Sequence, residues 1–176
     1  MLGNIRIVLV RPRGSGNIGS VARAMKNVGA KELAIVGRAR TQSFWARAMA
    51  VHGRDILGEA KCYPTIRDAI ADCTLVVGTT CRAGLYRSHS QTPRALAPAL
   101  ARAAKTGKVA LIFGPEDHGL SNKDLEHCQQ LITIPTGPDY PSLNVAQAVV
   151  ICLYEVYLAT LAPPLEDGVR RAQAEE

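Results

Sequence analysis

Three clusters of polar residues and glycines interrupt the apolar runs of this chain, and their residue types could bind and orient a small ligand. The first is Asn17-Ile18-Gly19-Ser20-Val21-Ala22-Arg23, and the second is Phe113-Gly114-Pro115-Glu116-Asp117-His118-Gly119-Leu120-Ser121. The third runs from Ile134 through a stretch rich in proline and glycine to Ser142-Leu143-Asn144. Glycine lets a backbone approach a ligand closely, and the carboxylate and guanidinium groups can form charge-assisted hydrogen bonds.

A fourth cluster, Thr79-Thr80-Cys81-Arg82, also follows an apolar run. In a parallel α/β sheet, the loops that follow the strands gather at one edge of the sheet, where ligands bind. We therefore expect the second, third and fourth clusters to share one site. Arg23 would lie two turns into a helix capped by Asn17 and could reach a bound phosphate there, although an isolated arginine of this kind is more commonly a solvated surface residue.

The stretch Gly14-Ser15-Gly16-Asn17-Ile18-Gly19 also matches the G-x-G-x-x-G motif of dinucleotide-binding folds. The context fits that motif poorly, because Arg11-Pro12-Arg13 separates the apolar run from the first glycine and no acidic residue ends the next run. Arg38 and Arg40 follow that run instead and could accept the 2′-phosphate of NADP. An NADP-dependent oxidoreductase is therefore one alternative hypothesis.

The apolar runs that must position these clusters alternate between strand-like and helix-like patterns. Strands are expected over 5–10, 33–36, 61–63, 75–78, 109–113 and 131–134, and helices over 17–28, 43–51, 65–71, 93–105, 121–128 and 142–161. Gly29 is expected to end the first helix in the left-handed conformation, and Ser121 to cap the short fifth helix. The alternation predicts an α/β fold, a mostly parallel sheet with helices on both faces. Residues 1–162 would form a single domain and 163–176 a charged tail.

Composition and charge favour a cytoplasmic protein that binds a polyanion. Of the 21 lysines and arginines, ten lie in residues 1–54 beside a single acidic residue, Glu32. Such a basic block suits nucleic acid, because neutralising phosphates releases counterions, although a solvated basic surface is the plainer interpretation. The five cysteines include no C-x-x-C pair, which argues against a metal site and a disulfide framework and fits a reducing compartment. The start of the chain leads directly into a strand, so we expect no signal peptide.

The last helix is apolar nearly all round, since only Gln147, Glu155 and Thr160 are polar between Val145 and Ala162. A stretch of this length could in principle cross a membrane. However, Glu155 lies near its centre and no lysine or arginine flanks its ends. We therefore expect no membrane span, and a helix that packs between the sheet and a second subunit.

Taken together and in order, the clusters resemble motifs of the SPOUT superfamily of methyltransferases, in the branch of the TrmH and TrmJ tRNA ribose methyltransferases. The resemblance covers residues 4–162. It rests on N-x-G-x-x-x-R (Asn17, Gly19, Arg23), on F-G-x-E-x-x-G-L-S (Phe113, Gly114, Glu116, Gly119, Leu120, Ser121) and on I-P-x(6)-S-L-N (Ile134, Pro135, Ser142, Leu143, Asn144).

The resemblance implies a C-terminal trefoil knot that binds S-adenosylmethionine, and a homodimer formed through the knot and the long C-terminal helix. The residues it implies for cofactor binding are Thr79, Thr80, Cys81, Gly114, Ile134, Ser142, Leu143 and Asn144. It implies that Arg23 is catalytic and acts across the dimer interface, that Asn17 and Glu116 organise their loops, and that Ser142 lies near the reacting ribose. A guanidinium is a poor proton acceptor at neutral pH, so we expect Arg23 to position a phosphate and to favour alkoxide character at the 2′-oxygen.

The substrate implied by the resemblance is tRNA, at the 2′-hydroxyl of C or U at anticodon-loop position 32. Another tRNA position, ribosomal RNA, and a catalytically silent RNA-binding module are alternatives. The expected RNA-binding residues are Arg11, Arg13, Arg23, Arg82 and Arg87, and a low aromatic content of 5% indicates mainly electrostatic contact. Pro115 and Gly84 replace arginines that relatives of the TrmJ type often carry, which weakens the choice of tRNA.

Overall fold

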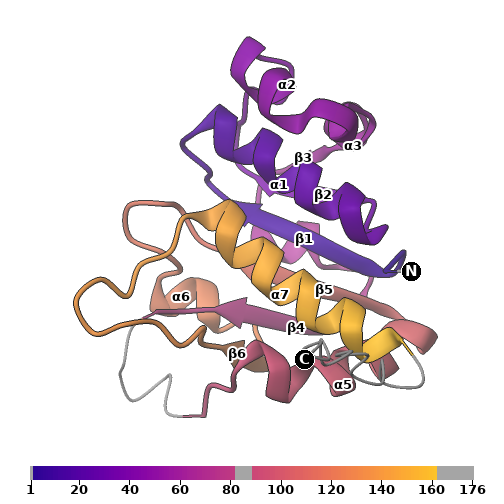
Figure 1. Ribbon diagram of the computed structural model, residues 1–176, viewed down its shortest axis with the longest axis vertical. Helices are drawn as coiled ribbons and strands as arrows, with labels where there is room; N and C mark the ends of the chain where they lie inside the picture. Colours follow the sequence, from indigo (N-terminus) through magenta and orange to yellow (C-terminus); the bar gives the residue numbers. More distant parts are fainter. Residues whose placement is uncertain (1, 82–88, 162–176) are drawn as a thin grey trace, which may run out of the picture.

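A six-stranded parallel sheet forms the centre of the protein, in the strand order β3-β2-β1-β5-β4-β6 (Figure 1). The computed structural model describes residues 2–81 and 89–161. The strands are β1 (Ile5–Val10), β2 (Glu32–Val36), β3 (Lys61–Tyr63), β4 (Cys73–Thr79), β5 (Lys108–Phe113) and β6 (Gln130–Ile132). Every pairing between neighbouring strands is parallel, which confirms the predicted sheet.

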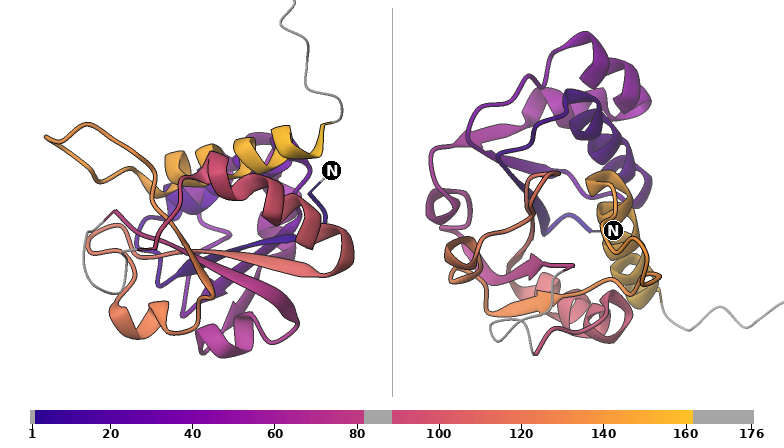
Figure 2. Two further views of the ribbon diagram at one scale, coloured as in Figure 1. Left: turned by 90° about the horizontal axis from the view of Figure 1, so that it is seen from below. Right: turned by 90° about the vertical axis from the view of Figure 1, so that its left-hand side faces the viewer.

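Helices cover both faces of this sheet, as the sequence predicts. One face carries α1 (Ser15–Val28), α2 (Phe44–Ala50), the short 3-10 helix η1 (Val51–Gly53), α3 (Arg54–Glu59), α5 (Pro93–Thr106) and α7 (Val145–Thr160). The other face carries α4 (Ile66–Ala69) and α6 (Asn122–Leu125). Figure 2 (left) shows α7 and α6 on opposite sides of the sheet.

Side chains along the central strand β1 point alternately to the two faces of the sheet, which explains why two separate hydrophobic cores form. All six residues of β1 are buried. Ile5, Ile7 and Leu9 face the core beneath α1 and α7. Val8 and Val10 face the core beneath α4 and α6. A strand that is apolar on both faces is stable only between two helical layers, so β1 lies at the centre of the sheet.

Helix ends show where sequence rules succeeded and where they did not. Gly29 ends α1 with φ +77°, and Ser121 and Asp124 form a capping box at α6. The expectation that Asn17 caps α1 is wrong, because the helix begins at Ser15 after Gly14. The last helix begins at Val145 and not at residue 142, and η1 and α3 had no counterpart among the expected elements.

No helix in the described part of the chain is long and apolar enough to cross a membrane. All five cysteines are free, and no cluster of possible metal ligands occurs among the described residues.

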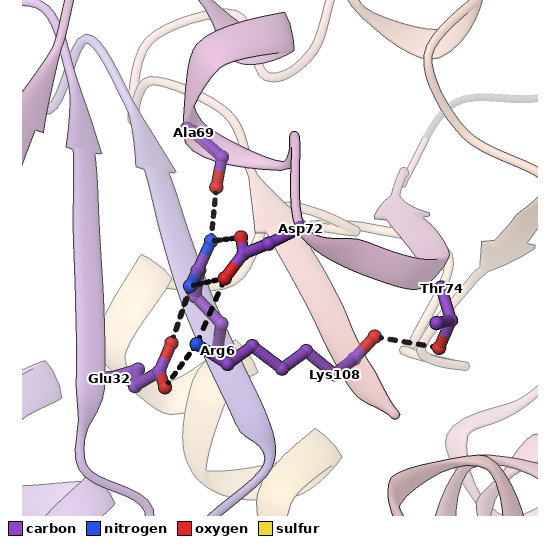
Figure 3. A network of polar contacts seen from close by, with 6 residues as sticks. All are labelled: Arg6, Glu32, Ala69, Asp72, Thr74 and Lys108. Carbon is purple, nitrogen blue, oxygen red and sulfur yellow. Dashed lines mark hydrogen bonds and ion pairs between the residues drawn. The ribbon is translucent and has the colours of Figure 1, made fainter. Parts of the chain in front are cut away.

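A buried arginine ties the strands together at the edge of the sheet opposite the motif loops (Figure 3). Arg6 on β1 donates to Glu32 on β2 at 2.6 and 2.8 Å and to Asp72 at 2.6 and 3.0 Å. It also donates to the carbonyl of Ala69 at 2.8 Å. Lys108 on β5 contacts both carboxylates at 2.9 Å. The Arg6 side chain is only 7% exposed, so this network anchors β1, β2 and β5 to the segment after α4.

We predict that Arg6→Met destabilises the protein by about 3 kcal/mol, the lower end of the range for breaking a buried ion pair, because Glu32 and Asp72 are partly exposed. Urea unfolding followed by circular dichroism measures this loss. Arg94→Met is the matched control, since Arg94 is 83% exposed in its pair with Glu155, and such pairs contribute little. Similar losses for the two variants would contradict a structural role for the Arg6 network.

Candidate functional site

A cavity of about 490 Å³ opens at the edge of the sheet where β4 and β5 end. Loops from three separate parts of the chain enclose it. Of the residues expected to bind the cofactor, it is lined by Thr79, Thr80, Cys81, Gly114, Ile134, Ser142 and Leu143. The expectation that these distant segments meet at one sheet edge is therefore confirmed by their positions.

The segment after β4 is held in place between its two neighbouring strands. The Thr79 hydroxyl donates to the carbonyl of Ile112 on β5 at 3.0 Å. The Thr80 amide donates to the carbonyl of Ile132 on β6 at 2.9 Å. These bonds fix the backbone that forms one wall of the cavity, and Cys81 continues that wall with an exposed side chain.

A tight backbone contact shapes the loop after β5. A Cβ atom on Gly114 would lie 2.2 Å from the carbonyl carbon of Gly119, a separation that no side chain can occupy. Gly119 itself has φ +67°, in the left-handed region that favours glycine. Its amide donates to the carbonyl of Pro115 at 2.8 Å. Both glycines of the second motif are therefore required by the fold of this loop.

The carboxylate of Glu116 links this loop to the start of α1. It accepts hydrogen bonds from the backbone amides of Arg13 at 2.9 Å and Gly14 at 3.1 Å. It also accepts from the Asn17 side-chain amide at 3.0 Å. Burial raises the pKa of Glu116. These hydrogen bonds together lower it by more than burial raises it, so the pKa lies below its ordinary value. Glu116 is thus ionised at neutral pH and acts as an acceptor.

A second amide extends this chain of hydrogen bonds to α7. The Asn144 side-chain NH₂ donates to the Asn17 oxygen at 2.9 Å. The Asn144 oxygen accepts from the amides of Ala146 at 2.9 Å and Gln147 at 3.4 Å and thereby caps the helix. The three motifs are therefore joined in the order Glu116, Asn17, Asn144. Asn144 was expected to bind the cofactor, but it is not among the residues that line the cavity.

The same contacts argue against the dinucleotide-binding hypothesis. In such a fold the amides at the start of the first helix bind a pyrophosphate. Here the Glu116 carboxylate already accepts from the Gly14 amide, and its negative charge would repel a phosphate. Neither Gly14 nor Gly16 lines the cavity. The glycine-rich stretch instead serves packing, since a Cβ on Gly19 would lie 2.1 Å from the carbonyl oxygen of Ala46 on α2.

The arginines expected to act in catalysis and RNA binding lie in different surroundings. Arg23 is exposed on α1 and is not among the residues that line the cavity. Arg11 pairs with Asp124 at 2.7 Å, and Arg13 pairs with Asp117 at 2.9 Å. Arg82 and Arg87 lie outside the described residues.

Comparison with known proteins adds a decisive observation to this geometry. A model of the SpoU rRNA Methylase family matches residues 4–154. The chain belongs to this family. The match spans all three motifs and the whole sheet, and it agrees with the resemblance found in the sequence.

Relatives within and near the family are named RNA methyltransferases. The tRNA (cytidine-2′-O-)-methyltransferase TrmJ of Methanocaldococcus jannaschii is 38% identical over 180 residues, covering 100% of this chain and 77% of that protein. The tRNA (cytidine/uridine-2′-O-)-methyltransferase TrmJ of Yersinia pestis is 42% identical over 161 residues, covering 92% and 63%. The chain thus spans less than two thirds of the Yersinia protein. An AdoMet-bound rRNA methyltransferase from Sinorhizobium meliloti has a TM-score of 0.71 at 25% identity, covering 92% of this chain and 59% of that one.

The family motifs did not reveal all of the apolar cavity lining. Ile132, Val145 and Ala148 line it together with the motif residues. Each lies at the end of a strand or in the first turns of α7. Apolar residues at such positions look like ordinary core in a sequence, so only their closeness to the motif residues could have pointed to them.

We predict that Glu116→Gln lowers the free energy of unfolding by about 1–2 kcal/mol, because an NH₂ group then replaces one of the acceptor oxygens that face the amides of Arg13, Gly14 and Asn17. Hydrogen exchange should also become faster at the amides of Arg13 and Gly14. Glu126→Gln is the matched control, since it makes the same chemical change at an exposed carboxylate away from these contacts and should leave that exchange unaltered. Unchanged exchange in Glu116→Gln would contradict the assigned contacts.

Proposed function

We propose that this chain transfers a methyl group from S-adenosylmethionine to a ribose 2′-hydroxyl of RNA, and that its substrate is tRNA. The observation that carries the proposal is a cavity lined by the second and third motifs of a SpoU family member, with the first motif joined to it through the Asn17–Glu116 hydrogen bond. The TrmJ relatives are named for action on the 2′-oxygen of cytidine, or of cytidine and uridine, in tRNA. These names support tRNA, and not ribosomal RNA, as the substrate that we propose for this chain. The anticodon-loop position 32 expected from the sequence is the site we propose.

The cavity suits the methyl donor in size and chemistry. A volume of about 490 Å³ lies within the range of small-molecule sites. Ile132, Ile134 and Leu143 offer an apolar surface for a flat adenine ring, while the loops around Thr80 and Gly114 offer backbone groups for its polar edges. When bound, the donor would supply an electrophilic methyl group. Its presence in the Sinorhizobium relative supports this assignment.

The residues around the cavity would have different roles in binding and orienting the RNA. Ser142 lines the cavity and is exposed at its mouth, where the ribose would lie. Arg23, from the partner subunit, would bind the phosphate next to that ribose and stabilise negative charge on the 2′-oxygen. Glu116 and Asn17 position the loops and do not take up the proton. Holding the two reacting groups together would supply much of the rate enhancement.

The exposed surface of α7 supports the homodimer that we propose. Val150 and Tyr154 are 47% and 53% exposed although the helix is mostly apolar. They lie one turn apart, so they share a face that a second subunit would cover. We further propose that the segment between β6 and α7 threads through the loops it crosses and forms the trefoil knot. The free cysteines are consistent with a cytoplasmic setting.

A basic depression beside the cavity supports RNA as the substrate. Arg11, Arg13 and Arg38 line a hollow of about 400 Å³ that shares Pro115 and His118 with the cavity. Phosphates bound here would lie next to the reacting ribose. Because Arg11 and Arg13 also pair with carboxylates, we assign these two a positioning role and expect Arg38 to contact phosphate more freely.

Incubation with radiolabelled S-adenosylmethionine and either total tRNA or ribosomal RNA tests this function, followed by mapping of the 2′-O-methylated nucleotide. We predict label in tRNA, and a loss of roughly hundredfold or more in turnover for Arg23→Ala, as for removal of a charge-stabilising donor. Donor binding measured by calorimetry should remain unchanged. Arg102→Ala, an exposed arginine on α5, is the control. Label in ribosomal RNA alone would refute tRNA as substrate, and near-normal turnover of Arg23→Ala would refute its catalytic role.

A further inference from the structure

Two aromatic side chains are exposed side by side at the start of α2. Phe44 is 75% and Trp45 63% exposed. Their ring centroids lie 5.4 Å apart with the ring planes at 77°. Met49, one turn further along, is 44% exposed. We call Phe44, Trp45 and Met49 the α2 surface. An exposed group of large apolar side chains indicates a binding surface more often than a single one does.

Arginines flank the α2 surface along the chain. Residues 38–54 contain Arg38, Arg40, Arg47 and Arg54 and no carboxylate. All four arginines are exposed, and within residues 2–81 and 89–161 none of them forms an ion pair. The Arg54 guanidinium donates to the carbonyl of Arg47 at 3.1 Å, which holds it beside the end of α2. The surroundings thus favour an anionic partner.

The α2 surface is rigidly placed one helix away from the proposed active site. Ser43 caps α2 by accepting from the Ala46 amide at 3.2 Å. Gly19 allows α2 to pack directly on α1 at Ala46, and Met49 lies beside Gly16. Gly16 immediately precedes Asn17 of the hydrogen-bonded chain. Figure 1 shows α2 against α1 at the end of the sheet that carries β2 and β3.

We propose that the α2 surface binds unpaired bases of the RNA substrate by stacking on Trp45 and Phe44, while the surrounding arginines bind the flanking phosphates. The inference rests on the proposed function for the identity of the polyanion. Base stacking on aromatic side chains tolerates any sequence, because every base has a π-face. A membrane surface fits less well, since α2 has only seven residues and interfacial helices are commonly much longer.

Intrinsic fluorescence provides a direct test, because Trp45 is the only tryptophan of the chain. Titration of the full chain with a short oligouridylate at fixed salt should quench this fluorescence. Trp45→Leu keeps an apolar side chain but removes the ring, and should bind the oligouridylate about tenfold more weakly in fluorescence anisotropy. Trp45→Phe should bind close to wild type. Thermal unfolding and binding of S-adenosylmethionine should be the same in all three proteins.

Several outcomes would overturn the proposal. These are absence of quenching, equal RNA affinity of Trp45→Leu and wild type, or a fluorescence response to anionic phospholipid vesicles in place of RNA. Conversion of Trp45→Leu to a monomer in light scattering would instead make the α2 surface a subunit contact. The proposed function fails separately: quenching without methyl transfer to RNA would refute the catalytic activity and leave the RNA surface in place.

Discussion

The carboxylate of Glu116 is the interaction on which the arrangement of the site depends. It satisfies two backbone donors at the start of α1 and holds Asn17, which in turn holds the residue that caps α7. The start of α1 is thereby fixed to two segments that lie 99 and 127 residues further along the chain. Because hydrogen bonds in a partly buried chain reinforce one another, the walls of the cavity should move as a unit and not as independent loops.

Close backbone packing is the second constraint, and it explains why the motifs contain glycine. Gly19 brings α2 against α1, Gly114 lets its loop fold back on Gly119, and Gly53 lies where a Cβ would be 2.7 Å from the Ala22 carbonyl oxygen. These glycines act through contacts within the protein and need no bound ligand to explain them. The α1–α2 contact also fixes the α2 surface at a set distance from the cavity, so a single packing arrangement would position both the reacting ribose and the neighbouring bases.

The sequence was sufficient for the sheet and for the meeting of the motif loops, because both follow from apolar runs and from the edge rule for parallel strands. It could not show which asparagine caps a helix. Asn17 and Asn144 are equally good capping residues by type. Only the position of Glu116, which is distant in sequence, decides that Asn17 bridges two loops while Asn144 caps a helix.

The charge count also overestimated how many cations are available to bind RNA. Arg6 is buried in an ion network, and Arg11, Arg13 and Lys26 are paired with carboxylates. The sequence likewise could not predict that Phe44 and Trp45 are exposed, because apolar residues on a helix usually indicate its buried face.

A double-mutant cycle between Glu116→Gln and Asn144→Ala tests the central claim most directly, with affinity for S-adenosylmethionine measured by calorimetry. Asn17 forms a hydrogen bond with each of these two side chains and thereby connects them. If the chain of hydrogen bonds acts as a unit, the effects of the two substitutions should deviate from additivity by more than about 0.5 kcal/mol. Strictly additive effects would contradict the account and would show that the motif loops are held independently.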